Sequence, residues 1–445
     1  MSLNGKPNNV IEDNILSILD SSIGTKDKQY LNDDRLEFIG AVRAAFLGLV
    51  HGRRPSNKIY EEIFYILRKG KSVELIVESH CLLEELGKRF PPLKSPLETE
   101  AWSPFTFDST VRYRETRKVD RSFIGLLDST DFHNLIKEIA EGSETNFQSN
   151  ELMSWRNMLV FQYIVNVLRG DLTFRNKMYQ ETTDWSILRE SLLTSLLSSR
   201  SIRYKTLIMD LVSLLCGMWQ MFSLVNADTS THRYENWTSE NGVDISEASY
   251  CVRQSITHLF MSIMELDALK KNADELRFTS RADNVRTPLM EIIIDELTYD
   301  KDMVSPFLQA FDEPKWKLEI VLLYFSKYNV KSVRTRRSCS STTEEFTFSW
   351  MMGFFSNITS TKSLTKKIGS YVVQVLLAHA LQAQLSLLAE QQNCTDQSDN
   401  NNVEDVCNSF LSAFRALKQA NGAMEISPSG RQALFTATAI LSSRS

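Results

Sequence analysis

Residues 56–86 read SNKIYEEIFYILRKGKSVELIVESHCLLEEL, and the order of residue types in this stretch indicates two consecutive helices. In the first half, apolar residues recur at intervals of three and four, which is the spacing of one helix face. These residues are Ile59, Ile63, Ile66 and Leu67. The same spacing returns in the second half, with inward positions at Leu75, Ile76, Leu82, Leu83 and Leu86.

Capping residues mark where each of these helices starts and stops. Ser56 and Ser72 stand at the two starts, where a hydroxyl can accept a hydrogen bond from a free backbone N–H. Arg68 and Lys69 place positive charge near the last carbonyls of the first helix, and Gly70 can adopt the left-handed conformation at low cost. A connection this short predicts antiparallel helices packed side by side.

The composition of the whole chain extends this helical prediction. Only 16 of the 445 residues are Gly and only 10 are Pro, and residues 105–287 contain no Pro. Because proline interrupts helix interiors, long helices are expected in this region. Further segments with helical periodicity are 32–50, 119–142, 150–169, 184–198, 201–226, 245–276, 288–299, 301–311, 314–329, 365–391, 402–420 and 429–442. We therefore predict an all-α fold, an irregular armadillo- or HEAT-like α-solenoid of stacked antiparallel helices without a strict sequence period.

Polar stretches divide the chain into parts, of which the segment QNCTDQSDNNNV at 392–403 has the least to bury. One continuous helical stack is equally compatible with this pattern. The predicted parts are a flexible N-terminal segment with one short helix (1–30), N-terminal and middle helical repeats (31–225), a polar loop (226–248), further helical repeats (249–391), a linker (392–403) and C-terminal helices (404–445).

The net charge and the cysteine spacing indicate which cellular compartment and which kinds of partner are expected. The formal net charge is −5, which argues against a nucleic-acid coat over the whole chain but allows a local basic stripe. The six cysteines have no CxxC spacing and indicate reduced intracellular thiols. Two apolar stretches, 207–225 and 371–389, are long enough to span a membrane, but Asp210 and His379 favour buried core helices, so no membrane association is expected.

The motifs of the sequence predict no catalytic, cofactor or metal site. Gly70, Lys71 and Ser72 mimic the end of a phosphate-binding loop, but Tyr65 stands where its first glycine is required. The pair His80 and Glu84 has metal-ligand spacing without a third ligand nearby. The patterns GxGxxG, GxSxG and HExxH do not occur in the sequence. We expect a protein that is not an enzyme, with no cofactor and no small-molecule substrate.

The block 279–337 carries the densest set of consistent patterns. Thr287 and Pro288 form a good cap and first residue of a helix, and Pro314 opens another that contains the expected core residue Trp316. From Lys327 to Arg337 there are five cations and no acid. Three interpretations stay open for this run: a nuclear-localisation or phosphate-binding patch, a kinase-recognised loop ahead of Ser338, or an ordinary solvated loop. Lys362, Lys366 and Lys367 would extend its surface if the loop folds back.

Six quoted segments resemble one family of plant negative regulators of systemic acquired resistance. They are DDRLEFIGAVRAA (33–45), AWSPF (101–105), TSRADNVRTPLMEIIIDELTYD (279–300), FDEPKWKLEIVLLYFSKY (311–328), VRTRR (333–337) and TKKIG (365–369). The resemblance covers most of the chain and is densest in the block 279–337. It implies a leucine-rich, armadillo-like nuclear protein that restrains defence-gene expression and is a non-SMC element of the SMC five/six complex, paired with another helical element in DNA repair and recombination. It implies no catalytic residues.

Residues and resemblance together predict a nuclear adaptor that binds protein subunits of the SMC five/six complex and contacts chromatin or DNA indirectly. The alternative is a direct DNA-binding transcriptional repressor. The residues expected in partner binding or nuclear localisation are Arg281, Arg286, Lys327, Lys331, Arg334, Arg336, Arg337, Lys366 and Lys367. Pro288 and Trp316 are expected to be structural.

Overall fold

The computed structural model describes most of the chain, and its described residues are almost entirely helical. They are 7–20, 28–48, 54–91, 104–105, 127–144, 151–200, 202–227, 245–279, 286–328, 346–392 and 400–443. Within these ranges the single β interaction is an isolated parallel bridge between Phe105 and Leu127, and there is no strand. The all-α prediction is confirmed, while the solenoid arrangement stays a prediction.

The chain forms two compact units. One comprises Met1–Leu214 and Met221–Leu289, and the other comprises Leu215–Gln220 and Met290–Ser445. We call them the N-terminal unit and the C-terminal unit, and we describe each by itself.

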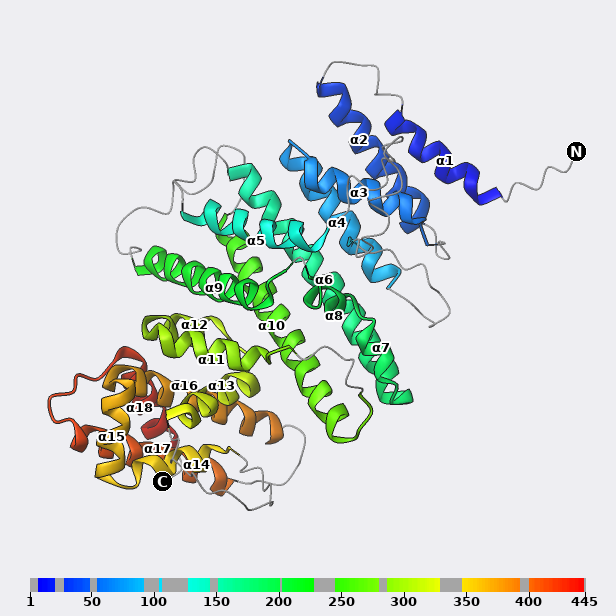
Figure 1. The fold of residues 1–445 in the computed structure, drawn as a ribbon. Helices are drawn as coiled ribbons and strands as arrows, with labels where there is room; N and C mark the ends of the chain where they lie inside the picture. The colour runs from blue at the N-terminus through cyan, green and yellow to red at the C-terminus, as the bar shows by residue number, and fades with distance from the viewer. Residues whose placement is uncertain are drawn as a thin grey trace, which may run out of the picture. The chain divides into compact units, whose positions relative to one another are not determined.

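The N-terminal unit is built by helices that pack on their neighbours. Helix α3 packs on α4, α4 on α6, and the long α6 along α10 (Figure 1). The helices are α1 (Pro7–Asp20), α2 (Lys28–Val42) with the π-helical turn η2 (Arg43–Leu47), α3 (Asn57–Lys69), α4 (Val73–Arg89), α5 (Ser129–Glu144), α6 (Glu151–Thr182), α7 (Trp185–Arg189), α8 (Leu192–Leu197), α9 (Tyr204–Ala227) and α10 (Ile245–Glu275).

The connection between α3 and α4 is as short as predicted, but the capping of α3 and the conformation of Gly70 differ from the prediction. The Ser72 hydroxyl accepts the Leu75 N–H at 3.4 Å, as predicted, whereas the Ser56 hydroxyl makes no capping hydrogen bond. Gly70 is not left-handed, because its φ is −56°. A Cβ at Gly70 would lie 2.8 Å from the Ile66 carbonyl oxygen and 3.1 Å from Ile76 Cγ1. Glycine is therefore required here by the close approach of two helices.

The C-terminal unit surrounds one long buried helix, α16. Helices α12, α13, α15, α17 and α18 all pack against it. The elements are α11 (Leu289–Tyr299), η8 (Lys301–Met303), α12 (Val304–Ala310), α13 (Pro314–Tyr328), α14 (Phe348–Met352), η9 (Gly353–Phe355), α15 (Ile358–Ile368), α16 (Ser370–Gln392), α17 (Asn400–Ala420) and α18 (Pro428–Ser442). By length and composition, 370–391 is a candidate membrane span, but 67% of its apolar window is buried inside the unit, which is typical of a core helix.

Several predicted helices differ from the observed ones. The segment predicted at 150–169 continues to Thr182, because no proline stops it and Asp171 pairs with Arg175 one turn later. The segment predicted at 184–198 is two short helices, α7 and α8. The segment predicted at 365–391 is broken by Gly369, whose φ of +106° ends α15 before α16 begins.

Candidate functional site: lysines at the ends of α13 and α15

Lys327 lies on the exposed side of the last turn of α13. The opposite side of this helix is buried, with Val321, Tyr324 and Phe325 in the core. The Lys327 ammonium contacts the Asp295 carboxylate of α11 and donates to Thr298 Oγ1 at 3.0 Å. The Lys327 side chain remains 40% exposed, so this ion pair is a surface pair of small energetic weight.

Two further lysines join the ends of neighbouring helices. The Lys367 ammonium, at the end of α15, donates to the carbonyl of Tyr328 at the end of α13, at 3.4 Å. The Lys301 ammonium of η8 donates to the carbonyl of Lys367 at 2.9 Å. The last carbonyls of a helix have no partner within the helix and carry partial negative charge, so lysines stabilise them. We call Lys301, Lys327, Lys366 and Lys367 the lysine cluster.

The lysine cluster lies where the basic run begins. Lys367 contacts Tyr328, which directly follows Lys327, and so α15 is beside the first residue of the run. The other predicted cations of the run, Lys331, Arg334, Arg336 and Arg337, lie outside the described residues, as do Arg281 and Ser338.

Arg286 has an internal role in the N-terminal unit. Its Nη2 lies 2.6 Å from Asp267 Oδ1 of α10, and its Nη1 donates to the Tyr204 hydroxyl of α9 at 2.9 Å. The guanidinium also lies over the Tyr204 ring, 5.1 Å from its centre. Its side chain is only 17% exposed. The sequence predicted Arg286 as a partner contact, but much of this side chain is used inside the unit.

The same Asp267 carboxylate caps α11. Its Oδ2 accepts the Leu289 N–H at 2.8 Å, and α11 begins at Leu289, one residue later than the predicted start at Pro288. Burial raises the pKa of Asp267, while Arg286 and the Leu289 N–H partly oppose that rise. This cap comes from a residue of α10, which a local sequence pattern cannot reveal.

Comparison with known proteins identifies the family. Residues 96–313 match the SNI1 middle domain, and residues 328–445 match the SNI1 C-terminal domain. Over 443 residues the chain is 40% identical to the negative regulator of systemic acquired resistance SNI1 of Arabidopsis thaliana, a match that covers 98% of this chain and 95% of that protein. The chain belongs to the SNI1 family.

The lysine cluster contains residues from the regions matched by both SNI1 domains. Lys301 lies in the part matched by the SNI1 middle domain, whereas Lys366 and Lys367 lie in the part matched by the SNI1 C-terminal domain. Lys327 lies just before the second match begins. The bond between Lys301 and Lys367 therefore links segments from both family domains within the C-terminal unit.

Trp316 is half-buried on α13, and Lys315 lies over its ring at 4.9 Å from the centre. A more deeply buried residue of the same helix is Lys317, for which the sequence carries no distinguishing pattern. Its burial lowers the pKa of its ammonium, and the nearby Asp312 opposes this. A lysine inside an apolar helix is hard to place from sequence, because its long stem also suits a surface position.

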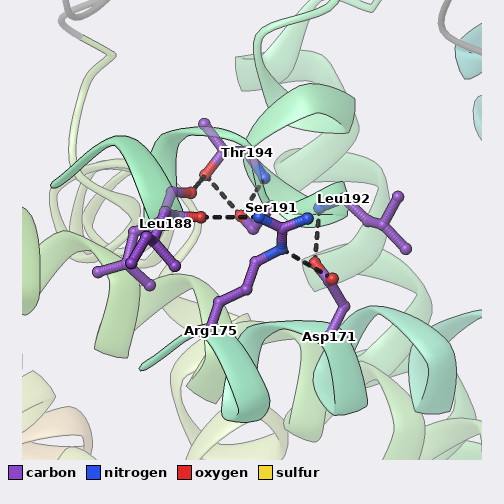
Figure 2. A network of polar contacts seen from close by, with 7 residues as sticks. Asp171, Arg175, Leu188, Ser191, Leu192 and Thr194 are labelled. Atoms are coloured by element: carbon purple, nitrogen blue, oxygen red, sulfur yellow. Dashed lines mark hydrogen bonds and ion pairs between the residues drawn. The ribbon is translucent and has the colours of Figure 1, made fainter. Parts of the chain in front are cut away.

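Figure 2 shows a polar network in the N-terminal unit that is formed by residues of α6, α7 and the start of α8. Asp171 accepts Arg175 Nε at 2.9 Å and the Leu192 N–H at 2.8 Å. Ser191 Oγ donates to Thr194 Oγ1, and Thr194 Oγ1 donates to the Leu188 carbonyl, both at 2.9 Å. Through the bond between Asp171 and the Leu192 N–H, the network holds the start of α8 against α6. In the sequence, only the four-residue spacing of Asp171 and Arg175 indicates one of these contacts, because residues so spaced are neighbours on a helix.

The pair His80 and Glu84 also has a structural environment. The Glu84 carboxylate accepts a hydrogen bond from the Asn166 amide at 2.9 Å, and burial lowers the pKa of His80 while Glu84 opposes it. Within the described part of the chain, no three His, Cys, Asp or Glu side chains are placed to hold a metal ion.

Proposed function

We propose that this chain is a negative regulator of systemic acquired resistance that acts as a nuclear adaptor through protein partners, and not as an enzyme. The observation that carries the proposal is the similarity to the Arabidopsis thaliana regulator along nearly the full length of both proteins. Similarity over both SNI1 domains supports transfer of the role of the whole protein rather than of one module.

The described chemistry supports an adaptor. The polar groups with the most elaborate contacts, Asp171 and Asp267, are used to cap helices. The exposed surface instead offers large side chains, including Leu276 (62% exposed) and Phe435 (75% exposed). Apolar and aromatic anchors on helix surfaces are what helix-mediated docking requires, whereas reactive groups are not needed.

The finer role follows from the family resemblance. We infer that the chain is a non-SMC element of the SMC five/six complex, where it pairs with another helical element and links DNA repair and recombination to the restraint of defence genes. The basic run 327–337 suits nuclear import or retention, because short clusters of Lys and Arg are typical of such segments.

Complementation in a plant that lacks its own SNI1 tests the regulatory role. Expression of this chain should restore the low basal transcript level of pathogenesis-related genes. Normal accumulation of the protein in nuclei without any reduction of those transcripts would refute the proposal.

Affinity purification from nuclear extract tests the finer role separately. SMC five/six subunits and a second helical non-SMC element should co-purify with the tagged chain. Complementation without these subunits would retain the regulatory role and reject membership of the complex.

A further inference from the structure

Helix α15 has an exposed face that is basic and rich in hydroxyls. Its buried side consists of Thr361, Leu364 and Ile368. The other side presents two rows of residues spaced four apart, which lie next to each other on a helix. The first row is Ile358, Lys362 and Lys366, the second is Thr359, Ser363 and Lys367, and all six residues are exposed.

Helix α15 carries no acid of its own. The sequence contains no Asp or Glu from 346 to 389, which includes all of α15 and most of α16. Lys362 and Lys366 form no ion pair with any residue that the structure describes. Acids are found on other elements: Asp295 contacts Lys327, the Asp300 carboxylate accepts the Asp302 N–H, and α17, which packs on α15, carries Glu404 and Asp405.

Two exposed tyrosines lie close in the chain to Lys301 and Lys367. Tyr299 is 90% exposed and lies two residues before Lys301, which is bonded to the carbonyl of Lys367. Tyr371 is 53% exposed and lies four residues after Lys367, on the first turn of α16. Because the bond between Lys301 and Lys367 joins the two chain segments, both tyrosines lie close to the end of α15.

The combination fits one class of ligand. Lysine, serine and threonine side chains are common contacts of nucleic-acid phosphates. Exposed aromatic rings beside a basic track stack on unpaired bases, which duplex DNA does not present. An acidic protein segment would also satisfy the lysines and could pack on the tyrosines, but unpaired nucleic acid supplies both a phosphate for each lysine and a flat base for each ring.

We propose that the exposed face of α15, together with Tyr299 and Tyr371, binds single-stranded nucleic acid directly. Lys362 and Lys366 contact successive phosphates, and the tyrosines stack on bases. The adaptor function requires only protein partners, so this inference goes beyond it. Failure of one of the two proposals would leave the other unaffected.

Fluorescence anisotropy with the full-length chain and a labelled oligothymidylate of about 16 nucleotides tests the proposal. Binding should weaken as salt increases, because bound phosphates release their counterions. The double variant K362A/K366A should bind more weakly and lower the slope of log affinity against log salt by about 1.4, which corresponds to two phosphate contacts. The control K69A/K177A removes the same charge from exposed lysines of α3 and α6 and should bind like the wild type.

Variants of the two tyrosines distinguish the contribution of stacking to the affinity from that of charge. Tyr299→Ala and Tyr371→Ala should each weaken binding about fivefold or more, whereas Tyr299→Phe and Tyr371→Phe keep the ring and should bind normally. The proposal is overturned if the chain does not bind the oligothymidylate, if K362A/K366A binds as well as the control, if the alanine variants retain full affinity, or if a duplex of equal length binds as tightly.

Discussion

The Oδ1 atom of Asp267 lies 2.6 Å from Nη2 of Arg286, and the other oxygen of the same carboxylate holds the first N–H of α11. One side chain of α10 therefore holds both Arg286 and Leu289, two residues at the end of the N-terminal unit. Tyr204 completes the arrangement from α9 through its hydroxyl and its ring.

Removal of the Asp267 carboxylate should destabilise the N-terminal unit. Asp267→Ala leaves Arg286 without its counter-charge and the Leu289 N–H without its acceptor. We expect a loss of about 2 kcal/mol in the free energy of unfolding, less than for a fully buried pair because both groups retain some solvent contact. Urea unfolding measures the loss. Tyr204→Phe removes a single hydrogen bond and should cost about 1 kcal/mol, so an equal or larger cost for this variant would contradict the assignment.

Acid should destabilise the C-terminal unit through His379. Burial and the nearby Lys317 ammonium lower the pKa of His379 to about 4, and Gln382 opposes this. The unfolded chain takes up a proton at this histidine below about pH 6.5, whereas the folded chain does not until about pH 4. Stability is therefore lost as the pH falls between these values, by about 3 kcal/mol at most.

Urea unfolding at pH 7.5 and pH 5.5 tests this titration. His379→Gln removes the group, so the variant should lose less stability than the wild type between the two pH values, by about 1 kcal/mol. Equal losses in both proteins would show that His379 is not the group responsible.

Two glycines should resist substitution for different reasons. Gly70→Ala should destabilise by about 1–3 kcal/mol, because its Cβ would crowd the Ile66 carbonyl and Ile76. Gly369→Ala meets no atom within 4 Å but forces alanine into a φ of +106°, at a cost of about 1–3 kcal/mol. Gly170→Ala, inside α6 with open space around it, is the control and should stabilise slightly. Thermal melting compares the three, and a neutral Gly70→Ala would refute the close-approach argument.

The basic run should act in partner binding or nuclear retention and not in stability. Replacement of Arg334, Arg336 and Arg337 by Ala removes three cations from a segment with few apolar side chains to bury. We expect a lower nuclear fraction or weaker capture of partners with an unchanged melting temperature. Microscopy and co-purification measure this, with K69A/K177A, which removes two cations from other helices, as the comparison. Unchanged localisation and capture would reject the prediction.

Local patterns predicted much of the fold because they report interactions within a few residues. The apolar spacing of Ile59 to Leu86 and the cap at Ser72 identified α3 and α4, and Pro314 marked the start of α13. Gly369 was missed as a break because helix-compatible residues stand on both sides of it, and the Ser- and Thr-rich start of α15 hid that helix. Asn357, whose side chain accepts the Thr359 N–H, compensates for that composition.

The candidate site was less predictable because it depends on contacts between distant segments. The sequence indicated that Lys366 and Lys367 would lie near the basic run only if the chain folded back. The contacts of Lys367 with Tyr328 and Lys301 depend on how α13, α15 and η8 pack. Likewise, nothing local distinguishes Arg286, held by Asp267 and Tyr204, from a cation at the surface.

The position of α16 has a consequence for the order of events on the ribosome. This apolar helix packs on α12, α13 and α15, which are synthesised before it, and on α17 and α18, which are synthesised after it. Until the last two helices emerge, one side of α16 lacks its cover, and such surfaces bind chaperones or aggregate. A premature stop codon after α16 would thus leave a nearly full-length protein with a permanently exposed apolar surface. We expect such late truncations to be degraded rather than to act as partial regulators.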